Sequence, residues 1–90
     1  MPILRPTPKF LARLDDYNRS DPMTAKRIGA AVERFVRTPD APGLNFEKLG
    51  GSDYHSIRVT QGVRIILRRA GADTFDLVNV GGHDIYRRYG

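Results

Sequence analysis

The sequence predicts one α+β domain, in which an N-terminal helical hairpin packs on one face of a twisted antiparallel β-sheet and a short C-terminal helix or tail follows. Two helix-start signals precede apolar residues at helical spacing in the first half of the chain. Short alternating segments separated by turn residues fill the second half. Ninety residues suffice for one domain and are too few for two, so residues 1–90 are predicted to form a single domain.

The first helix is predicted to begin at Thr7-Pro8, because threonine caps helix N-termini and proline suits the first helical position. It should continue to about Tyr17, with 18–20 forming a turn. Its apolar positions at helical spacing are Phe10, Leu11, Leu14 and Tyr17.

The second helix is predicted to begin at Asp21-Pro22, which repeats the same signal, and to end before Thr38-Pro39. One face carries Ile28, Ala31, Val32, Phe35 and Val36. A short connection between two helices predicts an antiparallel hairpin.

Four strands are predicted at 45–49, 54–60, 63–69 and 74–80, and a short helix or tail at 84–89. Gly50-Gly51, Gln61-Gly62 and 70–73 supply the turns, so the last three strands should form an antiparallel meander. With the helices all at one end of the sequence, they should cover one face of the sheet and leave the other open.

The composition points to a polyanionic partner. The chain has 15 Lys and Arg against 10 Asp and Glu, a net charge of +5, and 12 of the 15 basic residues are arginine. Guanidinium groups bind phosphate in a bidentate manner and stack on bases, which favours nucleic acid over a membrane surface. A generally basic protein without such a partner is the alternative.

No cysteine is present, which excludes disulfides and thiolate metal sites. No signal peptide or membrane-spanning stretch is found in the sequence, so a cytoplasmic location without membrane contact is expected. A site formed by His55, His83 and Asp84 lacks metal-ligand spacing. We therefore expect no metal, no cofactor and no small-molecule ligand.

Candidate site residues fall on the predicted open face. Strand alternation puts Arg58 and Arg64 there, on adjacent strands, where they would converge unless they are solvated or pair with Asp76 or Glu47. Glu47 is a candidate general base and the neighbouring Lys48 a phosphate contact; a surface ion pair is the alternative.

His83 is a candidate general acid, because it follows two glycines at a strand end and histidine titrates near neutral pH; the alternative is a turn residue. His55 alternates with core residues and is expected to be structural. At the end of the chain, Tyr86, Arg87, Arg88 and Tyr89 suit base stacking and phosphate contact in RNA. The alternative is that these residues anchor the tail on the core.

Four ordered segments resemble the RelE/ParE toxin superfamily. They are Pro42-Gly43-Leu44-Asn45-Phe46-Glu47-Lys48-Leu49, Tyr54-His55-Ser56-Ile57-Arg58-Val59, Val63-Arg64-Ile65-Ile66 and Val80-Gly81-Gly82-His83-Asp84-Ile85-Tyr86-Arg87. The preceding helical hairpin also matches the order of that superfamily. The resemblance implies a RelE-like toxin domain and an antitoxin partner. It also implies metal-independent cleavage of mRNA in the ribosomal A site, next to ribosomal RNA, by attack of the ribose 2′-hydroxyl on the adjacent phosphate.

The same resemblance assigns roles to individual residues. Glu47 resembles the base, Arg64 the arginine that stabilises the phosphorane, His83 the acid and Tyr86 the aromatic residue that orients the nucleotide. The expected phosphate and RNA contacts are Lys48, Arg58, Arg68, Arg87 and Arg88. Lys48 is the only lysine outside the predicted helices, which disfavours a lysine-based mechanism.

Three other functions are open: a ParE-like inhibitor of DNA gyrase, a non-catalytic nucleic-acid-binding module and a protein–protein adaptor. A nuclease needs Glu47, Arg64 and His83 in one cleft, whereas a binding module needs only a basic face. Glu47 and His83 on opposite surfaces would exclude catalysis.

Overall fold

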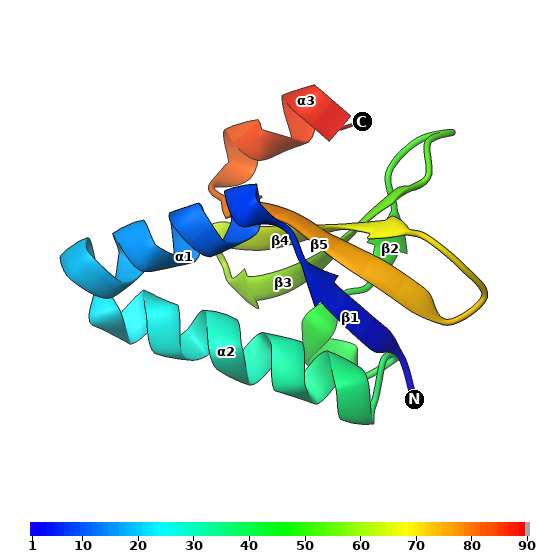
Figure 1. The fold of residues 1–90 in the computed structure, drawn as a ribbon, viewed down its shortest axis with the longest axis horizontal. Helices are drawn as coiled ribbons and strands as arrows, with labels where there is room; N and C mark the ends of the chain where they lie inside the picture. The colour runs from blue at the N-terminus through cyan, green and yellow to red at the C-terminus, as the bar shows by residue number, and fades with distance from the viewer. Residues whose placement is uncertain (90) are drawn as a thin grey trace.

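The computed structural model describes residues 1–89, apart from the side chain of His83. The elements in chain order are β1 (Ile3–Pro6), α1 (Pro8–Ser20), α2 (Pro22–Arg37), η1 (Pro42–Leu44), β2 (Glu47–Lys48), β3 (Tyr54–Thr60), β4 (Val63–Arg69), β5 (Thr74–Gly81), η2 (His83–Ile85) and α3 (Tyr86–Tyr89). The strands form one five-stranded sheet in the order β1-β5-β4-β3-β2. Figure 1 shows the hairpin of α1 and α2 on one side of this sheet and α3 on the other. The predicted α+β class is confirmed.

The two helices are joined by a single residue, Asp21. Its backbone N–H closes α1 on the carbonyl oxygen of Tyr17, and its side chain caps α2 by accepting from the backbone N–H of Thr24. The predicted turn at 18–20 is therefore wrong. These residues complete the last turn of α1, where the ion pair of 2.7 Å between Arg19 and Asp16 partly offsets the weak helix propensity of Asn18 and Ser20.

The sequence did not predict β1, and the sheet is mixed rather than purely antiparallel. β1 pairs in parallel with β5, from Ile3 opposite Thr74 to Pro6 opposite Leu77. Proline is tolerated there because β1 is an edge strand and its outer side needs no donor. Arg5 fixes the pairing further through an ion pair of 2.8 Å with Asp76.

The hydrophobic core lies between the sheet and the helical hairpin. Phe35, Ile28 and Ile57 are completely buried at its centre, and Phe35 packs edge-on against Phe46 and Phe75. The predicted strand 45–49 shortens to two residues, because Asn45 and Gly50 both adopt left-handed backbone angles, with φ of 52° and 56°. These residues bend the chain out of the sheet on either side of β2.

The second face of the sheet is not open, contrary to the expectation. Ser56, Ile66 and Asn79, which are register partners across β3, β4 and β5, are 1%, 0% and 3% exposed. The C-terminal segment covers them: the Tyr89 ring contacts Tyr54 edge-on at 4.9 Å, and its hydroxyl accepts a hydrogen bond from Asn79. Only the margins of this face remain accessible. No helix within residues 1–89 is long and apolar enough to cross a membrane.

Candidate functional site

Two arginines lie side by side on the second face of the sheet, at the end where the C-terminal segment begins. Arg58 on β3 is the register partner of Arg64 on β4, and Arg64 is in turn the partner of Gly81 on β5. We call Arg58, Arg64 and Gly81 the arginine row. The strand register confirms that Arg58 and Arg64 are neighbours on one face of the sheet.

The two arginines differ in environment. Arg58 is exposed, whereas Arg64 is 7% exposed. The Nη1 of Arg64 donates to the carbonyl oxygens of Thr60, Gln61 and Val63 at 2.6, 3.1 and 3.2 Å. Neither predicted alternative for Arg64, a solvated charge or an ion pair with Asp76 or Glu47, applies. Its guanidinium group is held over the β3–β4 turn, so its charge is fixed in position.

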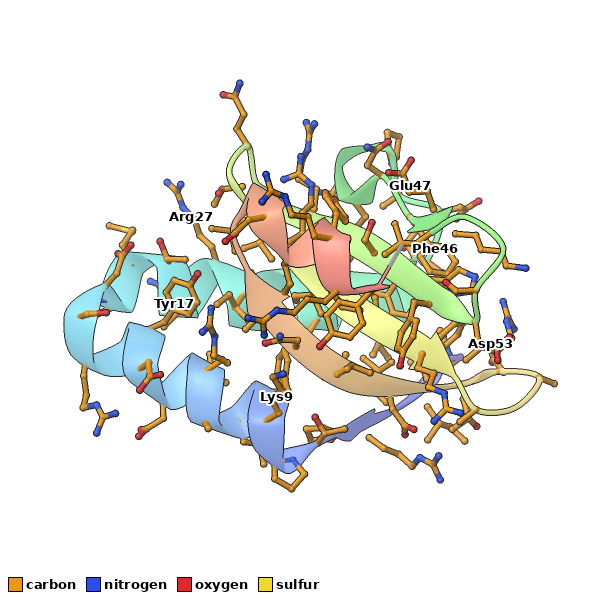
Figure 2. All side chains as sticks on the ribbon, turned by 90° about the horizontal axis from the view of Figure 1, so that it is seen from above. Lys9, Tyr17, Arg27, Phe46, Glu47 and Asp53 are labelled. Carbon is orange, nitrogen blue, oxygen red and sulfur yellow. The ribbon has the colours of Figure 1, made fainter. Side chains whose placement is uncertain are left out.

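Glu47 lies on the same face as the arginine row, at the sheet edge. It is the register partner of Ser56, which shares its face with Arg58 two residues further along β3. Figure 2 looks onto the face covered by α3 and shows Glu47 at the edge of the sheet. Glu47 is exposed, and no ion pair to it occurs among the described side chains. Lys48 pairs with His55 and therefore points to the opposite face.

The backbone of His83 begins η2, directly after the end of β5. Its side chain lies outside the described part of the structure, so the expected acid is placed only by its backbone. Beside it is a small cavity of about 120 Å³, lined by residues that include Arg13, Gly81, Gly82, Asp84 and Arg88.

Sequence reasoning missed Arg13. It projects from α1 to the end of β5, where its Nε donates to the carbonyl oxygen of Val80 at 3.3 Å. The spacing within α1 carries no signal for this contact, because it depends on how α1 packs against β5. Arg13 thus adds a cation next to the turn that carries His83.

The C-terminal residues divide into two groups. Tyr89 anchors the segment on the sheet, and its backbone carbonyl oxygen accepts from Ser52 Oγ at 3.2 Å. Tyr86 is half-buried, while Arg87 and Arg88 are exposed. The anchoring interpretation therefore holds for Tyr89, and the arginines remain accessible. Arg68 is exposed too, but it pairs with Tyr54, two rows away from the arginine row.

His55 is structural, as expected. It is 8% exposed and stacks on Phe46 with ring centroids 5.1 Å apart, on the helix side of the sheet. Burial, the largest cause, lowers the pKa of His55 below its usual value, with smaller contributions from Arg69 and Lys48. Among the described residues, no group of acidic or histidine side chains is arranged to hold a metal ion.

The order of the strands in the sheet determines the order in which the candidate site residues lie across the site. Glu47 lies on β2, Arg58 on β3 and Arg64 on β4, and His83 follows β5. Adjacent strands are about 4.8 Å apart, so the backbone of Glu47 and the end of β5 are about 14 Å apart when measured across the sheet. A carboxylate at one side, two cations in the middle and a histidine-bearing turn at the other side can flank one phosphodiester.

Comparison with solved structures shows that the fold is that of RelE-type toxins. The YoeB/ParE toxin from Agrobacterium tumefaciens superposes with a TM-score of 0.74 at 23% identity, covering 90% of this chain and 98% of that chain. YafQ in the DinJ–YafQ complex of E. coli gives 0.77 at 10% identity, with 94% and 97% covered. The YoeB–YefM toxin–antitoxin complex of Staphylococcus aureus gives 0.72 at 15% identity, with 92% and 98% covered. No protein-family model matches the sequence, and no curated protein matches it.

Proposed function

We propose that this chain is the toxin of a toxin–antitoxin module and that it cleaves mRNA on the ribosome without a metal ion. The observation that carries the proposal is the order of groups on one sheet face, from Glu47 across Arg58 and Arg64 to the turn of His83. The likeness in fold to the YoeB and YafQ toxins supports the same assignment.

The reaction is an in-line displacement at phosphorus. Glu47 removes the proton from the ribose 2′-hydroxyl, and the 2′-oxygen attacks the adjacent phosphate. The bond from phosphorus to the 5′-oxygen then breaks, and His83 protonates that oxygen. The products are a 2′,3′-cyclic phosphate and a new 5′-hydroxyl. Base and acid must stand on opposite sides of the phosphorus atom, and the order of the strands agrees with that requirement.

Arg64 and Arg58 stabilise the charge that develops on the phosphorane. A cation whose position is fixed beforehand costs no reorganisation during the reaction, and removing one such group typically costs about 3 kcal/mol of transition-state stabilisation. The backbone carbonyls of the β3–β4 turn hold Arg64 in this way. Tyr86 orients the nucleotide, and Arg68, Arg87 and Arg88 are expected to contact phosphates of mRNA or ribosomal RNA. Lys48 points to the opposite face of the sheet, so a phosphate contact of Lys48 would have to lie outside this site.

The partner proposed from the comparisons is a cognate antitoxin. YoeB is bound to YefM in the Staphylococcus aureus complex, and YafQ is bound to DinJ in the E. coli complex. An antitoxin that covers the exposed Arg58 and Glu47 would keep this chain away from the ribosome.

The test is inducible expression of the wild-type chain, with growth and the 5′ ends of mRNA measured together. The Glu47→Gln variant removes the base, and general base catalysis contributes about 100-fold or more. We expect arrest with new codon-aligned cuts in the wild type, and the loss of both in Glu47→Gln and in His83→Ala. Glu33→Gln is the matched control, because Glu33 is an exposed glutamate of α2 paired with Arg37. It should behave as the wild type.

Two outcomes would contradict the proposal that the chain is a nuclease. Arrest that persists in Glu47→Gln and His83→Ala, with DNA damage and without mRNA cuts, would identify a ParE-like gyrase inhibitor. No arrest in any variant, with RNA binding retained, would identify a non-catalytic module.

A further inference from the structure

Arg13 of α1 reaches the sheet face that carries the arginine row, although α1 itself packs on the other face. Figure 1 shows α1 beside the end of β5, where the chain leaves the sheet for η2. β1 pairs with β5 only as far as Leu77, so within residues 1–89 no strand covers that edge of β5 beyond this point. There the Nε of Arg13 donates to the carbonyl oxygen of Val80 at 3.3 Å. The guanidinium group thus lies at the uncovered edge.

Gly81 leaves the space that the end of this guanidinium group occupies. It is the register partner of Arg64, so a side chain at position 81 would project onto the same face as Arg64. A Cβ atom at Gly81 would lie 3.1 Å from the Nη2 of Arg13, which is closer than most Cβ contacts in proteins. Arg13 therefore takes the place of the missing side chain and adds a third cation beside the arginine row.

The cavity of about 120 Å³ beside η2 is lined in part by the same arginine. A cavity of this volume has room for several water molecules and therefore for one phosphate group. Arg13 and Arg88 bring two positive charges to the lining, and Asp84 brings one negative charge. No ion pair joins these three residues to one another or to other described side chains. The lining therefore has a net positive charge and favours an anion.

The direction of the proposed reaction indicates which phosphate would lie there. Glu47 acts on the 2′-hydroxyl of the upstream nucleotide, and His83 protonates the 5′-oxygen of the downstream nucleotide. The downstream nucleotide therefore leaves on the side of η2, and the phosphate on its 3′-oxygen continues in that direction. Arg13 and the cavity lie on this side of Arg64.

We propose that the cavity beside η2 is a phosphate subsite, in which Arg13 and Arg88 bind the phosphate on the 3′ side of the leaving nucleotide. That the phosphate belongs to RNA rests on the proposed function. Contact at this phosphate holds the leaving 5′-oxygen next to the turn of His83. Arg13 is then a substrate-binding residue that takes no part in proton transfer. If Arg13 only attached α1 to β5, its loss would not depend on where a ligand carries its phosphate.

The experiment compares two isomeric ligands that bind to the full chain without being cleaved. Both are the dinucleotide UpU with a 2′-O-methyl group on the first ribose, which blocks the attacking oxygen. One carries an extra phosphate on its 3′ end and the other on its 5′ end, so their charges are equal. The wild type should bind the 3′-phosphorylated isomer about tenfold more tightly in calorimetric titrations. Arg13→Gln should lose this preference and keep its affinity for the 5′-phosphorylated isomer within about twofold.

Two further variants separate binding from folding. Arg27→Gln is the matched control, because it removes the same charge from an exposed arginine of the helical hairpin and should keep the preference. Asp84→Asn leaves the contact between Arg13 and Val80 intact and removes the negative charge from the cavity. It should raise the preference for the 3′-phosphorylated isomer about threefold, even if Arg13→Gln proves too unstable to measure.

Equal affinity of the wild type for the two isomers would overturn the subsite, as would a failure of both isomers to bind. A preference that Arg13→Gln retains, or that Arg27→Gln loses to the same extent, would also overturn it. The nuclease proposal is tested separately by the mRNA 5′ ends. Cuts that depend on Glu47 and His83, without any isomer preference, would refute the subsite alone. An isomer preference without cuts in the wild type would refute the nuclease and leave the phosphate subsite.

Discussion

Replacement of Arg64 by methionine should lower the stability of the fold, whatever its effect on catalysis. Methionine keeps the apolar length of the side chain but removes the Nη1 donor, which contacts three backbone carbonyl oxygens at 2.6 to 3.2 Å. One nitrogen carries two hydrogens, so at most two of these bonds are strong. Hydrogen bonds to a charged group contribute about 1.5–3 kcal/mol each. Gln61 and Gly62 in the same turn are exposed, so water recovers part of this.

The net loss for Arg64→Met is therefore about 2 kcal/mol. In a domain of this size that lowers the melting temperature by about 8–16 °C. Arg64→Lys, which keeps one cationic donor, should lose about half as much. Thermal and urea unfolding of the purified variants measure the effect. The control is Arg58→Met on the neighbouring strand, an exposed arginine whose loss should change stability by less than about 0.5 kcal/mol. If Arg64→Met unfolds like Arg58→Met, the turn contacts contribute nothing and the argument fails.

Three further predictions concern other parts of the fold. Burial lowers the pKa of His55 below its usual 6.5. The free energy of unfolding should therefore decrease as the pH falls from about 6.5 through the lower pKa of the folded state. The urea midpoint of the His55→Phe variant should depend less on pH across that window than the midpoint of the wild type. Gly50→Ala should destabilise by about 1 kcal/mol, because φ at Gly50 is 56°. By contrast, Gly29→Ala should stabilise α2 by about as much, since nothing lies within 4 Å of the added Cβ; equal melting temperatures would contradict this contrast. Tyr89→Phe removes the acceptor of the Asn79 side chain and should speed hydrogen exchange of the α3 amides without a comparable change at β4.

The parts of the fold that the sequence predicted are those specified by adjacent residues. Thr7-Pro8 and Asp21-Pro22 start both helices with local hydrogen bonds. The turn at Gln61-Gly62 fixes the register of β3 and β4, and with it the pairing of Arg58 and Arg64. β1 and the Arg13 contact were missed because each depends on a partner about seventy residues away in the sequence. Local pattern does not encode such pairing.

The covered second face restricts where the proposed active site can lie. A basic sheet face left open, as the sequence suggested, would offer a broad platform for RNA. Instead Tyr89 contacts Tyr54 and Asn79, and the residues between them are buried. Some of the residues expected to act on RNA lie on this face, at the margin of the covered area, and are near one another. They are Glu47 at the β2 edge, Arg58, and the turn that follows β5. Arg68 is separated from Arg58 and from the turn after β5 by the row of Ser56, Ile66 and Asn79. In the proposed nuclease, a phosphodiester would therefore reach Arg64 from the end of the sheet where the β3–β4 turn and η2 meet. Arg68→Ala should then reduce mRNA cleavage less than Arg58→Ala, and equal losses in the 5′-end assay would show that RNA crosses the covered face.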